Sequence, residues 1–236
     1  MQIREAIVLA GGLGTRLREA VPDLPKCMAP VNGKPFLYYL LNYFHKQGIE
    51  RFLLSVGYKH ELVSGYFNSL SLPFDLAYVI EKEPLGTGGG IQLALKESND
   101  NNVLVLNGDT FFKIDLASFS NFHLNTNAEC SLALKPMQHF DRYGLVETTG
   151  DHKISSFREK RPYDQGSING GVYAINKTRF LNRLLPVKFS LEKDYFEKVV
   201  EEGCLYGQEQ DGYFIDIGIP ADYQRVQEDF LSFDQL

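Results

Sequence analysis

Tryptophan is absent from this chain of 236 residues, and cysteine occurs only three times, at Cys27, Cys130 and Cys204. An odd number of widely spaced cysteines is typical of neither a disulfide framework nor a zinc cluster, and it favours a reducing compartment. Long apolar runs are also missing, because none approaches the roughly 20 residues that a membrane helix needs. The charged start of the chain, with Arg4 and Glu5, differs from a signal peptide. We therefore expect a cytoplasmic protein that has no contact with a membrane.

A surplus of positive charge is lacking as well, since the formal net charge is −6. Proteins that bind nucleic acid broadly present a basic face, so this composition argues against nucleic acid as a partner. The first 34 residues are nevertheless locally positive, with five basic and three acidic side chains. A positive segment on an acidic body favours a small anionic ligand over a polymer.

Low-complexity linkers and internal repeats are absent, so one continuous domain over residues 1–236 is expected. Short apolar runs alternate with helical patterns, which predicts an α/β fold: a Rossmann-like, mixed but mostly parallel central sheet flanked by helices. Strands are expected at 6–9, 52–56, 76–80, 103–106, 130–135, 145–148, 153–157 and 171–175. Helices are expected at 36–44, 61–67, 90–96, 177–185, 191–202 and 221–233.

A glycine-rich segment that contains Arg16 follows the first expected strand, and Lys26 comes after it. Glycines allow positive φ and let backbone N–H groups approach a phosphate. The spacing excludes a dinucleotide fingerprint, because Leu17 stands at the place of the third glycine. Gly33-Lys34-Pro35 likewise lacks the ending and the strand context of a P-loop. A tight turn with ordinary surface cations is the alternative interpretation.

Gly11-Gly12-x-Gly14-Thr15-Arg16-Leu17 followed by Pro25-Lys26 resembles the signature of the sugar-1-phosphate nucleotidyltransferases. The resemblance implies a GT-A-like fold in which this loop wraps a triphosphate and Arg16 and Lys26 neutralise its oxygens. The implied nucleotide-binding residues are Leu9, Ala10, Gly11, Gly12, Gly14, Thr15, Arg16, Lys26, Glu81, Gly86, Thr87, Gly108 and Asp109. Cys27 replaces the proline that is usual in the family and removes a fixed φ. We expect no thiolate role for it.

A second glycine loop, residues 81–90, is similar to the family segment that lies beside the base and the ribose. Four of the five residues from Gly86 to Gly90 are glycines, and close approach to a ligand would explain them. The resemblance implies that Glu81 lies near the base edge. An ionised carboxylate only accepts hydrogen bonds, and guanine offers two adjacent donors, so GTP is favoured over UTP, CTP or dTTP. A solvated loop acid is the alternative interpretation of Glu81.

Two aspartates have neighbours that indicate a metal site. Asp109 follows an apolar strand, and the carboxyl ends of parallel strands are where open α/β sheets bind ligands. Asp216 is flanked by apolar residues, so its burial requires a metal or a hydrogen-bond network. Both match the metal-binding aspartates of the family, which implies Mg²⁺ bridging phosphate oxygens.

The sugar-binding segments are implied by the resemblance alone. Glu159 would accept hydrogen bonds from sugar hydroxyls, Lys160 would contact the sugar phosphate, and Asn169 would offer both a donor and an acceptor. A solvated run of charges is the alternative interpretation of Glu159 and Lys160. The implied set is Tyr143, Gly144, Glu159, Lys160, Asn169 and Gly170.

The resemblance extends from about residue 7 to residue 223 and is strongest to family members that use GTP and D-glycero-α-D-manno-heptose 1-phosphate. It implies GMP transfer to that sugar, giving pyrophosphate and GDP-heptose for bacterial surface polysaccharides. Arg16, Lys26, Asp109 and Lys160 would be the catalytic residues. Mannose 1-phosphate is the alternative sugar, and a homo-oligomer is left open. No β-helix acyltransferase domain is expected after the last short helix.

Two other classes of protein are left as alternatives. A glycosyltransferase would commonly carry an Asp-x-Asp metal motif, which Asp109-Thr110-Phe111 lacks. A nucleotide-sensing module would bind the same ligands without turnover. Release of pyrophosphate from GTP and a sugar phosphate distinguishes both from a nucleotidyltransferase.

Overall fold

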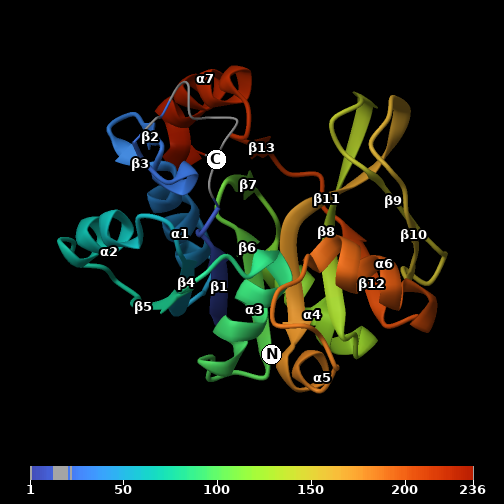
Figure 1. The fold of residues 1–236 in the computed structure, drawn as a ribbon. Helices are drawn as coiled ribbons and strands as arrows, with labels where there is room; N and C mark the ends of the chain where they lie inside the picture. The colour runs from blue at the N-terminus through green and yellow to red at the C-terminus, as the bar shows by residue number, and fades with distance from the viewer. Residues whose placement is uncertain (1, 13–20, 22, 236) are drawn as a thin grey trace.

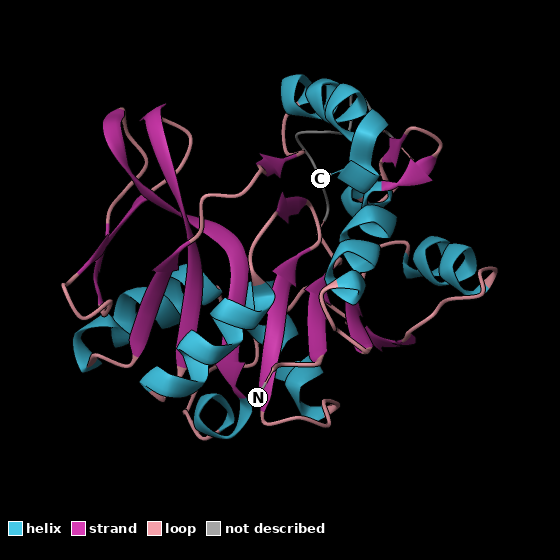
Figure 2. Cartoon of the chain, turned by 180° about the vertical axis from the view of Figure 1, so that it is seen from behind, coloured by secondary structure: helices cyan, strands magenta, loops and turns pink. Residues whose placement is uncertain are grey.

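A nine-stranded β-sheet runs through the centre of the molecule (Figures 1 and 2). The computed structural model describes residues 2–12, 21 and 23–235. The order along the sheet is β10-β9-β11-β6-β1-β4-β5, and β8, paired with β11, carries β12. The strands are β1 Glu5–Leu9, β4 Arg51–Val56, β5 Asp75–Ile80, β6 Asn102–Asn107, β8 Cys130–Phe140, β9 Leu145–Thr148, β10 Ile154–Phe157, β11 Tyr163–Asn176 and β12 Leu205–Glu209.

Strand directions confirm the mixed, mostly parallel sheet. β1 pairs in parallel with β4 and β6, β4 with β5, and β8 with β12. β11 is antiparallel to β6, β8 and β9, and β9 is antiparallel to β10. The carboxyl ends of β1, β4, β5 and β6 therefore lie at the same edge of the sheet. Open α/β sheets bind ligands at this edge.

Helices cover both faces of the sheet. The continuous apolar run of β1 predicts this, because a strand that is buried on both faces needs apolar side chains at every position. Ala6 and Val8 belong to one hydrophobic core and Ile7 to the other, because side chains alternate along a strand. One face carries α1 Phe36–Lys46 and α4 Leu116–Thr126. The other carries α3 Gly86–Lys96, α5 Lys177–Leu181 and the continuous stretch η3 Leu191–Phe196, α6 Glu197–Val199 and η4 Val200–Glu202. No helix in the described ranges has the length and apolar character that spanning a membrane would require.

The last part of the chain returns to the first part. In Figure 1, α7 Pro220–Asp229 lies beside the hairpin of β2 Pro30–Val31 and β3 Lys34–Pro35. The Tyr223 hydroxyl donates to the Pro30 carbonyl at 2.6 Å, and the Asn32 amide donates to the Gln227 carbonyl at 2.9 Å. This packing brings the segment before α7 close to the segment before β2. The other short elements are η2 Lys26–Met28, α2 His60–Asn68, β7 Thr110–Phe112, β13 Phe214–Asp216 and η5 Phe230–Gln235.

Several elements differ from those expected. Helix α4 and strand β12 were not predicted. The apolar pattern of α4 is obscured because this helix buries the polar residues Ser120 and His123. The strand expected at 171–175 is the last part of a strand that begins at Tyr163. The helix expected at 177–185 ends at Leu181. The lengths of β11 and α5 depend on tertiary contacts, which a local sequence pattern does not show.

Helix α3 begins at Gly86, whereas the expected helix began at residue 90. The close approach at its glycines comes largely from the chain itself. A Cβ on Gly88 would lie 2.1 Å from the Phe189 ring, and one on Gly89 would lie 2.3 Å from the Val187 carbonyl oxygen. The expectation that all these glycines serve a ligand was therefore wrong for Gly88 and Gly89, which make room for residues 187–189.

Gly88→Ala is therefore expected to destabilise the fold. The added methyl group collides with Phe189, and overpacking a core costs about 1–3 kcal/mol, which outweighs the gain of about 1 kcal/mol in helix propensity. Urea unfolding measures the loss. Gly65→Ala is the matched control, because a Cβ there meets nothing within 4 Å. Equal stability of the two variants would contradict the packing role of Gly88.

Candidate active site

Two aspartates that are distant in sequence meet at one lysine. Asp109 lies between β6 and β7, and Asp216 ends β13, which pairs with β7 so that Asp216 is opposite Thr110. Lys26 Nζ lies 2.6 Å from Asp109 Oδ2 and 3.2 Å from Asp216 Oδ1. The expected convergence of Lys26, Asp109 and Asp216 is thus present in the structure. One ammonium group between two carboxylates leaves a net negative charge at this point.

Local hydrogen bonds hold the two carboxylates in place. The Gly218 N–H donates to Asp216 Oδ1 at 2.8 Å, and the Thr110 hydroxyl donates to Asp109 Oδ1 at 3.3 Å. Asp109 is 37% exposed and Asp216 is 26% exposed, so both reach solvent. Nothing in the described part of the chain bonds to Asp216 Oδ2, which leaves an oxygen open toward a ligand.

These carboxylates offer oxygen ligands, which a hard divalent cation such as Mg²⁺ prefers. Mg²⁺ is usually bound through one or two carboxylates together with waters and substrate phosphates. No group of three or more histidine, cysteine or acidic side chains suited to a metal occurs among the described residues. Two carboxylates therefore fit a metal that shares its coordination with a phosphate better than they fit a closed protein cage.

Lys26 is positioned by the residue that follows it. Cys27 is buried, and its thiol donates to the Ala10 carbonyl at 3.6 Å, which ties η2 to the end of β1. Burial, and then the charge of Asp109, raise the pKa of Cys27 to about 12. The thiol at the place of the usual proline is thus a packed, buried side chain, and the expectation of no thiolate role stays a prediction.

We expect Cys27 to resist alkylation at pH 8. Burial raises the pKa of Cys27 to about 12, and burial also raises the pKa of Cys130 well above its ordinary value. Iodoacetamide labelling followed by peptide mass spectrometry should find Cys204, which is only partly buried, modified first. Labelling in denaturant, where all three thiols react, is the control. Rapid modification of Cys27 in the folded protein would show that it is not enclosed.

The start of the first glycine loop adjoins Asp109. The Gly108 N–H donates to the Leu9 carbonyl at 3.0 Å, and the Ala10 N–H donates to the Ser55 carbonyl at 2.8 Å. A Cβ on Gly108 would lie 2.6 Å from the Leu9 oxygen, so only glycine fits there. The predicted phosphate-binding residues Gly14, Thr15 and Arg16 lie outside the described residues.

A cavity of about 730 Å³ opens beside this loop. The predicted residues Leu9, Gly11, Gly12, Glu81, Gly86 and Thr87 line it, together with Gly57, Tyr58, His60, Ile80, Lys82, Glu83 and Pro84. Glu81 accepts from the Ser55 hydroxyl at 2.9 Å and from the Leu85 N–H at 3.1 Å, each through a different oxygen. Glu81 thus stabilises the loop in which it lies. The second lone pair of each carboxylate oxygen can still accept a hydrogen bond from a ligand.

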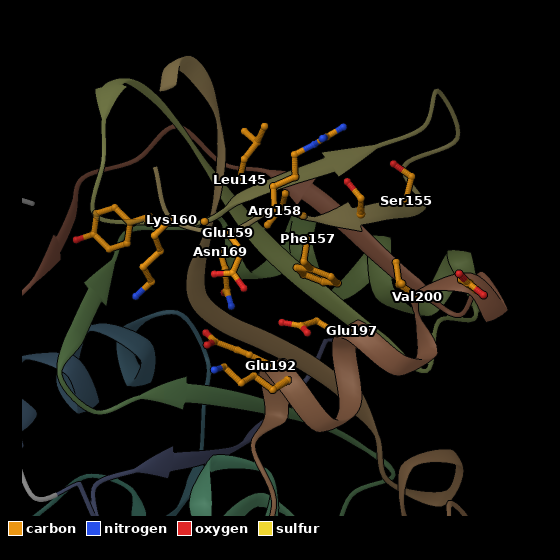
Figure 3. A pocket seen from close by; sticks show the side chains of 16 residues that line it. Leu145, Ser155, Phe157, Arg158, Glu159, Lys160, Asn169, Glu192, Glu197 and Val200 are labelled. Atoms are coloured by element: carbon orange, nitrogen blue, oxygen red, sulfur yellow. The ribbon is translucent and has the colours of Figure 1, made fainter. Parts of the chain in front are cut away.

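A second cavity, of about 510 Å³, contains most of the residues predicted to bind the sugar (Figure 3). Tyr143, Gly144, Glu159, Lys160 and Asn169 line it. Tyr143 also lines a cavity of about 310 Å³ that contains Asp216, so the sugar-binding candidates continue toward the aspartates.

Gly170 is the one predicted sugar-binding residue that does not line this cavity. A Cβ on it would lie 2.4 Å from the Phe112 ring, which gives it a packing role in β11. Asn169 uses its amide for the Tyr173 hydroxyl at 3.0 Å and its oxygen for the Gly171 N–H at 2.9 Å. These bonds fix the orientation of Asn169 in the wall.

The sequence did not identify the opposite wall of the 510 Å³ cavity. Glu192, Lys193, Glu197, Val200 and Glu201 come from η3, α6 and η4. Their region was expected to be helical, but an ordinary helical pattern does not place these acids on one face. The three acids share one wall because η3 is a π-helix, whose turn contains one more residue than that of an α-helix. This π-helix was not predicted from the sequence.

Comparisons with known proteins identify the family of this chain. The D-glycero-alpha-D-manno-heptose 1-phosphate guanylyltransferase of Aneurinibacillus thermoaerophilus is 48% identical over 97% of this chain and 99% of its own. An enzyme of the same name from Campylobacter jejuni is 47% identical over 93% and 96%. The crystal structure of HddC from Yersinia pseudotuberculosis complexed with GMP-PN is 34% identical, with a TM-score of 0.86, and covers 97% of this chain and 100% of that chain. The nucleotidyl transferase family matches residues 5–232, and this chain belongs to it.

Proposed function

We propose that this protein transfers GMP from GTP to D-glycero-α-D-manno-heptose 1-phosphate, releasing pyrophosphate and giving GDP-heptose. The observation that carries the proposal is the meeting of Lys26, Asp109 and Asp216, close to the glycine-loop cavity and to the cavity lined by Tyr143. The relatives that carry this enzyme name, and that match nearly their full length, support the choice of substrates.

The reaction needs electrostatic help more than it needs a base. A phosphate monoester has a second pKa near 6, so the attacking oxygen of the sugar phosphate is already ionised at neutral pH. A dianion must nevertheless approach the α-phosphorus of a highly negative triphosphate. We propose that Arg16, Lys26 and Lys160 offset this repulsion and stabilise the departing pyrophosphate.

Asp109 and Asp216 would hold the divalent cation, which we propose to be Mg²⁺. All the ligands they offer are oxygens, which this ion prefers, and phosphate oxygens and waters would complete its coordination. The metal would supply charge neutralisation at the phosphates. Lys26 would then be released from the carboxylates to the triphosphate.

The two larger cavities divide the substrates between them. We propose that the 730 Å³ cavity takes the nucleotide, with backbone groups at Leu9, Gly11 and Gly12 beside it and Glu81 near the guanine. The 510 Å³ cavity takes the sugar, with Lys160 on its phosphate and Glu159 on its hydroxyls.

We place the reaction in the cytoplasm, where the three free thiols would stay reduced. Both hydrophobic cores pack on one sheet, which supports a single domain.

A matrix of pyrophosphate-release assays tests the proposal. GTP, UTP, CTP and dTTP are each combined with heptose, mannose and glucose 1-phosphates, and product is identified by mass spectrometry. We expect the highest kcat/KM for GTP with the heptose phosphate. Preference for mannose 1-phosphate, or for another nucleotide, would replace the proposed substrates. Binding without product would indicate a nucleotide sensor, and consumption of a nucleotide sugar a glycosyltransferase.

A further inference from the structure

The wall of the 510 Å³ cavity formed by η3, α6 and η4 carries three acidic side chains and one lysine, Lys193. Glu192, Glu197 and Glu201 all line it. Figure 3 shows Glu192 and Glu197 on the side opposite Ser155 of β10. Within the described ranges, none of these three carboxylates makes a hydrogen bond or an ion pair with the protein. Arg158, on the other wall, is already paired with Glu147 at 2.9 Å. The acids are therefore available to accept hydrogen bonds from a ligand.

The cavity has an inner and an outer end. Tyr143 marks the inner end, because it also lines the cavity of Asp216. Figure 3 shows Lys160 directed away from Val200, while Glu197 lies between Asn169 and Val200. In the proposed function Lys160 contacts the phosphate of the sugar phosphate, so that phosphate would lie at the inner end, toward Asp216 and the cation that it would hold. The carbon chain of the sugar then extends toward Glu197 and Val200.

The backbone at Glu197 is anchored by an apolar neighbour, while Glu197 itself is exposed. Its neighbour Phe196 is fully buried and stacks on Phe157, with ring centroids 5.5 Å apart and planes within 8°. Phe157 and Val200 line the same cavity as Glu197. A hydrogen bond formed beside such apolar surfaces, once a ligand excludes water, is stronger than one in open solvent.

We propose that Glu197 recognises the exocyclic C6 and C7 hydroxyls of the heptose, and so determines the choice of a seven-carbon over a six-carbon sugar phosphate. The inference rests on the proposed function. Mannose ends in one CH₂OH group beyond its ring, whereas the heptose ends in CH(OH)–CH₂OH, a vicinal diol. The two oxygens of a carboxylate can accept from both hydroxyls of a diol. A sugar that lacks one of them leaves an acceptor unpaired, which is how polar sites reject shorter analogues.

Substitution of Glu197 tests the inference with a matched pair of substrates. The heptose and mannose 1-phosphates differ by one carbinol, so the ratio of their kcat/KM values isolates its recognition. We expect Glu197→Gln to lower that ratio at least 10-fold, mainly by raising KM for the heptose phosphate, and Glu197→Ala to lower it further. The kcat/KM for mannose 1-phosphate should change less than threefold. Glu228→Gln, an exposed acid on α7, is the control for the change in charge.

The outcomes separate this inference from the proposed function. Equal losses for both sugars, or an unchanged ratio in folded Glu197→Gln, would overturn the role of Glu197 alone. A wild-type enzyme that makes no product from the heptose phosphate would overturn the proposed function and the inference together. The amide of Glu197→Gln is isosteric with the carboxylate, and thermal unfolding of each variant checks that it is folded.

Discussion

Asp109→Asn is expected to lower kcat by about 10³-fold, since a charge that stabilises the transition state is worth several kcal/mol and each 1.4 kcal/mol is a factor of ten. The substitution keeps the shape of the side chain but removes half of the negative charge that Asp109 and Asp216 present to a cation. Lys26 retains its bond to Asp216, so the fold should stay intact. Pyrophosphate release at saturating substrates measures the loss, and circular dichroism checks the fold.

The control for this prediction is Asp164→Asn. Asp164 is exposed on β11 and lines none of the three cavities, and its carboxylate bonds to no other residue of the described chain. Its variant should keep wild-type turnover. Asp216→Asn should resemble Asp109→Asn, because the two carboxylates face the same lysine. Turnover near that of the wild type in Asp109→Asn, at ordinary Mg²⁺ concentrations, would show that Asp109 does not hold the metal.

Lys26→Met is expected to lower kcat by about 10²–10³-fold, the usual loss when one group aimed at developing charge is removed. It should also change how a divalent cation affects stability. Without Lys26, the two carboxylates lose the one ion-pair partner that they share among the described residues. The variant should therefore have a lower Tm than the wild type in EDTA, and Mg²⁺ should raise its Tm more than it raises that of the wild type.

This pair of readouts separates an electrostatic role from a packing role. Lys96→Met, at the exposed end of α3, removes a positive charge far from the site and is the matched control. If Lys26 only fills space, methionine should support both Tm and kcat. If the loss of Tm in EDTA is not reduced by Mg²⁺, the two aspartates do not gather a cation when the lysine is gone.

The site was predictable where a motif is local. The glycine loop and Asp109 each follow a short apolar strand, so their position at one edge of the sheet follows from strand direction, and Lys26 comes after the glycine loop in the sequence. Asp216 was found by its resemblance to a family motif and by the energetic cost of burying an acid, since no local pattern connects it with Asp109. The antiparallel pairing of β13 with β7, and the return of α7 to β2, are what bring it there.

Other residues were misread because their reasons are not local. Gly88 and Gly170 looked like ligand-binding glycines, yet each makes room for an aromatic ring from a distant part of the chain. Glu192 and Glu197 were expected only as part of a helix over residues 191–202, and no role was predicted for them. The π turn at η3 moves them onto one wall of a cavity, which a period of 3.6 residues does not predict.

By itself, the sequence determined the alternation of strands and helices, the mostly parallel sheet and the identity of the charged residues at the strand ends. These properties depend on hydrophobic periodicity and on short motifs, which neighbouring residues specify. Only the tertiary structure decided that one lysine lies between two aspartates and that an acidic wall closes the second cavity. Both arrangements arise from contacts between segments distant in sequence, and such contacts leave no periodic signal in the residues that make them.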